Sequence, residues 1–304
     1  MIHTSMKSRN KGSGNLRVEI SKMLLNPMFI IEVLVIIVMF LSANITIGMD
    51  MRSPAWAMYQ YMNGNIAADE LYGADAFSAF IYGWGSWFTL FIPVVSSFCT
   101  IPLLCDERNG GMTRFILIRQ KKRTYILGKF LGAFICGGMA VIAAGLIYLV
   151  LCFSILPLPD EGILSMLPMV YGSESMYKVI AFKLFLGFIY GGFQALFAIM
   201  FSSWLKNRYL IICLPFLLKY CYDQVITLIG SSFIMSDAHP MADSQSADIS
   251  EIIWRLSSNG IMNIKLSDSS FINLLPVIIT AVVTIALFLL YRTGLNHRKD
   301  FARP

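Results

Sequence analysis

Residues 105–129 read CDERNGGMTRFILIRQKKRTYILGK and form the most charged stretch of the chain. Charged residues make up 14% of the whole sequence, yet nine of the residues in this stretch are Asp, Glu, Lys or Arg. Long apolar runs flank it on both sides. Because charged side chains are costly in lipid, this stretch has to lie in water at a membrane face. The fold is therefore expected to consist of membrane spans, with this loop outside the lipid.

The composition of the whole chain supports a membrane protein. Of the 304 residues, 57% are hydrophobic, and the mean hydropathy is +0.66. A soluble domain is nearer 45–50% apolar. The apolar runs recur along the whole length, which predicts one membrane domain over residues 1–304. We expect its parts to be an N-terminal segment (1–27), a bundle (28–292) and a tail (293–304).

Six apolar runs are long enough to be membrane-spanning helices, which need about 20 residues each. They cover residues 28–48, 79–104, 125–156, 179–204, 208–235 and 271–292. The third is long enough to tilt, kink or extend beyond the bilayer. None shows the alternation of apolar and polar residues that the strands of a membrane barrel require. The predicted fold class is all-α, with six transmembrane helices.

The positions of Lys and Arg predict the orientation of these spans. Cytoplasmic connections carry an excess of both residues. The N-terminus, the loop 105–124, the connection 205–208 and the C-terminal end carry seventeen, whereas the loops 49–78, 157–178 and 236–270 carry four. Both termini and the loop 105–124 are therefore expected in the cytoplasm. The net charge of +6 is explained by this arrangement, so nucleic acid is not an expected partner.

The chain before the first span has an amphipathic pattern. Leu16, Ile20, Met23 and Leu24 recur at spacings of three and four residues, and Pro27 then interrupts the run. This pattern favours a helix in the membrane interface that leads into the first span. An ordinary juxtamembrane segment is the alternative.

Motifs of catalysis and metal binding are absent from the sequence. Gly128-Lys129 is followed by Phe130 and lacks the upstream glycine of a phosphate loop. There is no HExxH, no GxSxG and no paired-carboxylate motif, and the three histidines lie far apart. The six cysteines show no CxxC spacing, which argues against a zinc site or a disulfide framework. The chain is not expected to be an enzyme or to bind a metal or cofactor itself.

The order of residues in the charged stretch resembles a family signature. Glu107-Arg108 opens a short helix, Gly110-Gly111 breaks or bends it, and residues 113–118 form a further turn before the basic residues 119–123. Permeases of type-2 ATP-binding-cassette exporters have a first cytoplasmic loop of the approximate form E-R-x-x-G-T, an apolar stretch, a turn with Pro and Arg, and L-x-G-K at the next span. The matching residues here are Glu107, Arg108, Gly111, Arg123, Leu127, Gly128 and Lys129.

The chain departs from that pattern at two points. Met112 stands where the family usually has Thr, and Thr113 follows one position later. The turn at 119–121 lacks the usual Pro. Both departures concern the geometry of the loop. The six spans and the amphipathic N-terminal segment extend the resemblance over the whole chain.

The resemblance implies a function and partners. Such a permease forms the translocation path of an ATP-driven exporter in the cell membrane, pairs with a second permease subunit, and binds ATP and Mg only through a separate ATP-binding subunit. The cytoplasmic helix between spans 2 and 3 would lie in a groove of that subunit and transmit its closure. The residues expected in this coupling are Glu107, Arg108, Gly110, Gly111, Thr113, Arg114, Arg123 and Lys129. The implied cargo is hydrophobic or amphipathic: a peptide such as a bacteriocin, a drug or a lipid.

Charged residues also fall inside the predicted spans. Lys219 and Asp223 are four residues apart on one face of the fifth span. They are expected either to neutralise each other structurally or to mark a substrate path or subunit contact. Glu32 and Lys183 lie near span ends, from which their charged groups are expected to reach the interface.

Two other classes of function are left open by the sequence. A secondary transporter or channel needs no ATPase, but it would favour more intramembrane polar residues and inverted halves, and no such repeat is visible. A non-transporting membrane sensor or immunity protein would tolerate the loss of Glu107, Arg108 and Gly111.

Overall fold

The computed structural model describes residues 11–47, 50–65, 75–119, 121–171, 175–236, 252, 255–257, 259–265 and 271–297. Over these residues the chain is helical apart from one short antiparallel hairpin. The hairpin joins β1 (Ile45–Ile47) to β2 (Asp50–Arg52), with Thr46 opposite Met51. The all-α fold class is confirmed at this level.

The helices fall into a first half and a second half of the chain. The first half contains α1 (Lys11–Leu24), α2 (Pro27–Leu41), α3 (Pro54–Met62), α4 (Ala76–Gly83), α5 (Ser86–Val95), α6 (Ile101–Asn109) and α7 (Met112–Arg119). The second half contains α8 (Lys122–Ile155), α9 (Glu161–Tyr171), α10 (Met176–Ser202), α11 (Arg208–Ser236), the 3-10 turn η1 (Gly260–Asn263) and α13 (Phe271–His297).

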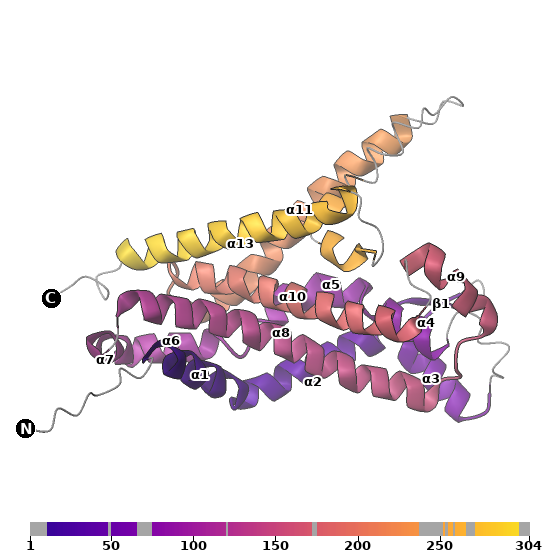
Figure 1. Cartoon of the computed structure of the whole chain (residues 1–304), viewed down its shortest axis with the longest axis horizontal. Coiled ribbons are helices and arrows are strands. Elements are labelled where there is room, and N and C mark those ends of the chain that lie inside the picture. The colour runs from indigo at the N-terminus through magenta and orange to yellow at the C-terminus, as the bar shows by residue number, and fades with distance from the viewer. Residues whose placement is uncertain are drawn as a thin grey trace, which may run out of the picture.

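The bundle is elongated, and its two ends differ (Figure 1). One end holds α1, α7 and the C-terminal end of α13. The other end holds the hairpin together with α3, α4 and α9. The beginning of α1 and the end of α13 therefore lie at the same end of the bundle.

Several helices are long and apolar enough to cross a membrane. Four stretches qualify singly: Lys122–Ile155, Leu167–Ser202, which contains α10, Arg208–Ser231 and Asn273–His297. Two further spans result if each of two bent helix pairs counts as one: Arg17–Leu24 with Pro27–Leu41, bent by 62°, and Ala76–Gly83 with Trp87–Val95, bent by 49°. Among the described residues there are thus four to six candidate spans, as expected of a multi-pass membrane protein.

The first predicted span ends earlier than expected. The run 28–48 was expected to be helical throughout, but α2 ends at Leu41 and the chain enters the hairpin at Ile45. The β-branched residues Ile45, Thr46 and Ile47 favour the extended conformation there. At about 1.5 Å per residue, the 15 residues of α2 measure roughly 22 Å. This is less than the ~30 Å hydrocarbon core of a bilayer.

The second predicted span, 79–104, is interrupted. Its helices α4 and α5 are separated at Trp84-Gly85, and α6 starts anew at Ile101. Pro93 lies inside α5 and Pro102 lies in the first turn of α6, where the missing N–H of a proline costs least. The third predicted span, by contrast, is one unbroken helix of 34 residues, roughly 51 Å long at 1.5 Å per residue. The expectation that it reaches beyond a bilayer's thickness agrees with this length.

The polar loops contain helices that the sequence analysis did not anticipate. Within 49–78, α3 begins with Pro54 at its first position, and the Ser53 side chain accepts a hydrogen bond from the Trp56 N–H at 3.2 Å. Within 157–178, α9 covers Glu161–Tyr171. Ser53 followed by Pro54 is a typical start of a helix and was visible in the sequence. The polar composition around it favoured a loop instead.

The predicted amphipathic helix before the first span is present as α1. The side chain of Leu16 lies outside what the structure describes. Asn26 caps the following helix, because its side chain accepts a hydrogen bond from the Met28 N–H at 3.1 Å, and Pro27 occupies the first position of α2. Helix α1 packs on α8, and the Met23 side chain of α1 is fully buried against α8.

The hydrophobic core near the end of the bundle that carries the hairpin is rich in aromatic side chains. Phe40 of α2 lies 4.9 Å from the ring of Trp84 and 5.1 Å from the ring of Tyr148. The Tyr148 hydroxyl donates a hydrogen bond to the Ala79 carbonyl at 2.8 Å. These contacts bring α2, α4 and α8 together, because a buried Tyr needs a partner for its hydroxyl.

The helices α8 and α10 make the most extensive contact in the molecule. At its centre two glycines face each other, since a Cβ built on Gly137 would lie 2.9 Å from the Gly191 carbonyl oxygen, and the reverse distance is also 2.9 Å. Neither helix has room for a larger residue there. Small residues at such positions let two helices approach closely.

Candidate functional site

The charged stretch 105–129 folds into the end of α6, the whole of α7 and the start of α8. The predicted break at Gly110-Gly111 is confirmed: α6 ends at Asn109, and α7 starts at Met112. Gly111 has a φ of +67°, a left-handed conformation that side chains disfavour. A glycine at this position allows the chain to reverse sharply between the two helices.

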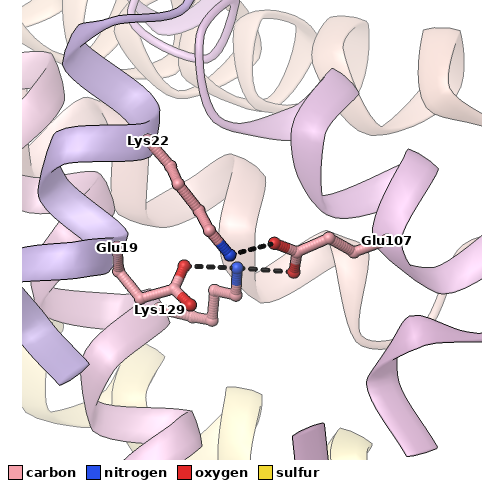
Figure 2. Close-up of polar contacts among 4 residues, drawn as sticks. All are labelled: Glu19, Lys22, Glu107 and Lys129. Atoms are coloured by element: carbon pink, nitrogen blue, oxygen red, sulfur yellow. Dashed lines mark hydrogen bonds and ion pairs between the residues drawn. The ribbon is translucent and has the colours of Figure 1, made fainter. Parts of the chain in front are cut away.

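A cluster of four charged side chains joins this stretch to the N-terminal helix (Figure 2). We call Glu19, Lys22, Glu107 and Lys129 the charge cluster; they come from α1, α6 and α8. The Lys129 Nζ lies 2.5 Å from the Glu19 Oε2 and 2.6 Å from the Glu107 Oε2. The Lys22 Nζ lies 3.8 Å from the Glu107 Oε1. One ammonium group thus bridges two carboxylates that are 88 residues apart in the chain.

The burial of the charge cluster determines how much stability is lost when one of its charges is removed. The Lys129 side chain is 1% exposed and that of Glu107 is 7% exposed, whereas Lys22 is 47% exposed. The Lys129–Glu107 contact is an ion pair without the angles of a good hydrogen bond, whereas Lys129 donates a hydrogen bond to Glu19. Two carboxylates and two ammonium groups balance in charge. Removing one buried member would leave an uncompensated charge, which is costly.

Arg108 anchors the end of α6 to the end of α10. Its Nη1 donates to the carbonyls of Ser202 at 3.2 Å and Leu205 at 2.9 Å, and its Nη2 donates to the carbonyl of Lys206 at 2.7 Å. The last carbonyls of a helix have no partner within the helix. The guanidinium satisfies one of them, the Ser202 carbonyl, together with two carbonyls of the segment that follows α10, and it carries the charge that a helix C-terminus favours.

The helix α7 has one face on the bundle and one face exposed. Thr113 is buried, and Ile116 and Leu117 pack against the core formed by α6, α8, α10 and α13. On the opposite side, Phe115 is 69% exposed and Ile118 is 82% exposed. With Met112, which is also exposed, they recur every third residue and so form a single apolar stripe. We call Met112, Phe115 and Ile118 the α7 stripe.

The eight residues predicted to couple to an ATPase therefore differ in where they lie. Glu107, Arg108, Thr113 and Lys129 point into the protein and hold α6, α7 and α8 in place. Gly110 and Gly111 form the turn, and Arg123 is exposed at the start of α8. The side chain of Arg114 lies outside what the structure describes.

The α7 stripe was not among the predicted site residues. Residues 113–118 were expected to form an apolar turn, whereas they belong to the helix α7. The three-residue spacing of Met112, Phe115 and Ile118 was the signal that could have identified the outer face of this helix.

The predicted intramembrane pair is brought together as an ion pair. The Lys219 Nζ lies 3.9 Å from the Asp223 Oδ2, and it also lies 5.8 Å from the centre of the Tyr190 ring. The Lys219 side chain is 6% exposed and that of Asp223 is 24% exposed. The contact confirms that the two residues share a helix face.

The other two intramembrane charges differ from expectation. Glu32 was expected to reach the interface, but it is fully buried, and its Oε2 accepts a hydrogen bond from the Cys99 N–H at 3.3 Å. Lys183 donates to the Met262 carbonyl at 2.6 Å and thereby holds η1 against α10. Both side chains find partners inside the bundle because the turn between α5 and α6 supplies Cys99 and η1 supplies Met262, which the separate runs of sequence do not show.

Among the residues that the structure describes, no group of three or more His, Cys, Asp or Glu could hold a metal ion.

The chain matches no family model, and no curated protein matches it. The interpretation of the site therefore depends on its geometry.

Proposed function

We propose that this chain is the membrane-spanning permease subunit of an ATP-driven exporter, and that α7 is the contact for a separate ATP-binding subunit. The observation that supports the proposal most is the contrast between the two faces of α7. Its inner face is fixed to the bundle, while its outer face presents the α7 stripe at the end of the bundle where α1 begins and α13 ends.

A firmly held helix with an exposed apolar face is suited to transmitting movement. The charge cluster connects the helix before α7 to α1 and α8, and Arg108 connects the same helix to α10. A push on α7 would therefore reach three parts of the bundle instead of being absorbed by a loose loop. For ATP to shift the balance between inward-open and outward-open states, the ATP-binding subunit must bind those states with different affinity.

The remaining features of the proposal follow from the same topology. We propose six spans, with each bent pair counted as one, and both termini in the cytoplasm. Only 17% of the apolar window of α11 and of α13 is buried in the single chain. These two helices are available for contact with lipid and with a second permease subunit, which the proposed exporter requires.

The direct test uses purification together with an ATP-binding subunit encoded next to the chain. The unchanged chain is expected to retain that subunit and to export cargo in an ATP-dependent manner. The double variant Phe115→Ser/Ile118→Ser is expected to lose at least tenfold of the retained subunit, because two large apolar contacts are removed. Met62→Ser is a matched control, since Met62 is 71% exposed at the opposite end of the bundle.

Two results would count against the proposal. If the unchanged chain retains no ATP-binding subunit, the exporter assignment fails. If the double variant retains the subunit as well as Met62→Ser does, the assignment of α7 as the contact fails, although the exporter assignment can still stand.

A transporter driven by an ion gradient is the second candidate. The observation that favours it is Glu32, a fully buried carboxyl whose Oε1 has no hydrogen-bond partner among the described residues. Intramembrane carboxyl groups of this kind serve proton relays in transporters. Uptake or efflux in vesicles driven by a pH gradient without ATP, and abolished by Glu32→Gln, would support this candidate over the exporter.

A further inference from the structure

A cavity of about 300 Å³ lies between α10, α11 and α13 and is closed by the segment around η1. Its walls are mainly apolar, with Phe193, Phe197, Leu218 and Val283 among the lining residues. Its volume is at the lower end of the ~300–1,000 Å³ typical of small-molecule sites. Such a volume suits a single alkyl chain with its headgroup.

The polar groups of this cavity are cationic or neutral. Lys219, Arg255 and Gln194 line it, and none of the described lining residues is Asp or Glu. Arg255 is already engaged, because its Nη1 donates to the Asn263 carbonyl and to the Asn273 Oδ1, both at 2.9 Å. Its hydrogen bonds hold the closing segment against α13.

Lys219 is the group with capacity to bind a ligand. It is 8% exposed, and its Nζ makes no hydrogen bond with any residue that the structure describes. Its ion pair with Asp223 is 3.9 Å long, too long for a hydrogen bond, so no described residue accepts from the three N–H donors of the ammonium group. A buried donor without an acceptor is costly. An acceptor that enters the cavity would relieve that cost.

Asp223 lies on the other side of Lys219. A second cavity of about 340 Å³ is lined by Lys219 and Asp223 together with Asn44, Trp87 and Asn259. Lys219 lines both cavities, while Asp223 lines only the second. The Asp223 carboxylate therefore lies outside the apolar cavity, where it competes for the Lys219 ammonium group with any acceptor that enters the cavity.

We propose that the α10–α11–α13 cavity binds a single-chain amphiphile with an anionic headgroup, with the headgroup on Lys219 and the alkyl chain between Phe193, Phe197 and Val283. A carboxylate or phosphate on the headgroup would form charge-assisted hydrogen bonds with the ammonium group. The chain would bury its surface against the aromatic and aliphatic wall. Binding does not depend on the proposed export function, whereas transport of this ligand does.

The test measures binding of labelled dodecanoate to the full chain in nanodiscs of zwitterionic lipid. Dodecanol and dodecyltrimethylammonium have the same alkyl chain without the negative charge and serve as matched probes. The unchanged chain is expected to bind dodecanoate saturably and at least tenfold more tightly than either probe. Equal binding of all three would overturn the proposal, because it would show partition into an apolar surface.

Removing the positive charge of Lys219 and the negative charge of Asp223 in separate variants distinguishes a ligand-binding role of Lys219 from a structural role of the pair. Lys219→Met is expected to weaken dodecanoate binding at least tenfold and to leave dodecanol binding unchanged. Asp223→Asn is expected to tighten dodecanoate binding several-fold, because it removes the competing carboxylate. If Asp223→Asn weakens binding as much as Lys219→Met does, the pair acts as a structural unit and the proposal is wrong.

Two further variants guard against loss of folding. Val283→Phe fills the cavity without changing Lys219 and is expected to reduce dodecanoate binding, so unchanged binding by this variant contradicts the assigned position. Lys178→Met removes an exposed lysine from α10 outside the cavity and is expected to bind like the unchanged chain.

The source of the amphiphile is distinguished by a second set of nanodiscs that contain an anionic phospholipid. If the phospholipid competes with dodecanoate in the unchanged chain and not in Lys219→Met, the natural occupant is a membrane lipid that inserts one of its chains. If dodecanoate binding is unaffected by the phospholipid, the occupant is a free amphiphile. Competition that persists equally in Lys219→Met contradicts the placement of the headgroup on that lysine.

Discussion

Lys129 connects more of the molecule than any other charged residue in the proposed contact region. Its ammonium group lies between Glu19 of α1 and Glu107 of α6, and its own backbone belongs to α8. In the sequence it is the last residue of an L-x-G-K pattern. Its pairing could not be predicted, because the partners lie 110 and 22 residues away and only the packing of three helices brings them together.

Replacement of Lys129 by Met is expected to destabilise the protein by about 3–5 kcal/mol, the usual cost of leaving buried charges uncompensated. The triple variant Glu19→Gln/Glu107→Gln/Lys129→Met removes all three charges and should recover much of this loss. Lys22→Met is the matched control, with an expected change within about 1 kcal/mol because Lys22 is half exposed. The test is to measure the free energy of unfolding of these three variants in mixed micelles. A single variant no less stable than the triple variant would contradict the role of the cluster.

Arg108 is expected to be irreplaceable by Lys. A lysine ammonium group is a compact donor that cannot reproduce the fork of the guanidinium, which contacts the Ser202 carbonyl at the end of α10 and two carbonyls of the segment that follows. Since each hydrogen bond from a charged group contributes roughly 1.5–3 kcal/mol, Arg108→Lys should lose at least one such bond and Arg108→Ala should lose more. Thermal unfolding tests this order, and equal stability of Arg108→Lys and the unchanged chain would contradict it.

At the scale of the element, α8 and α10 determine how closely the bundle can pack. Glycines along α8 allow close helix contacts, but their partners differ along the helix. Gly128 and Gly132 face α1, whereas Gly137 and Gly138 face α10. Glycines in a long apolar run favour close packing. They do not identify the partner helix, because residues along a long helix face different neighbours as the helix crosses the bundle.

Gly137→Ala is expected to destabilise the α8–α10 contact by about 1–3 kcal/mol through overpacking. The added Cβ would lie 2.9 Å from both the Ala195 Cβ and the Gly191 carbonyl oxygen. Gly162→Ala in α9 has nothing within 4 Å and should be neutral or slightly stabilising. The change in unfolding free energy of the two variants provides the comparison. A Gly137→Ala variant as stable as Gly162→Ala would show that the two helices are not in close contact.

At the scale of the whole molecule, composition predicted a helical membrane protein, and the candidate spans agree. The end of the first helix at Leu41 and the breaks in the second run were not predicted, although Pro93 and Pro102 of the second run were visible in the sequence. Hydropathy averages over about 20 residues, so a run that contains a break still scores as one span. Helix breaks are local events, decided by caps and prolines that such an average does not weigh.

The two ends of the bundle are expected to lie on opposite sides of the membrane. With the exposed Cys213 and Cys221 replaced by Ser, single cysteines at positions 62 and 121 provide the test. A membrane-impermeant maleimide should label position 62 in intact cells and position 121 only after the membrane is opened. Labelling of both positions from the same side would contradict the proposed arrangement.

The central claim is that the α7 stripe contacts a separate ATP-binding subunit. The most direct measurement is site-specific photo-crosslinking from position 115 in living cells, with position 62 as the control. The account predicts a crosslink from position 115 to a protein that mass spectrometry identifies as an ATP-binding subunit, and none from position 62. Crosslinks from position 115 to lipid alone, or to the same proteins as position 62, would contradict it.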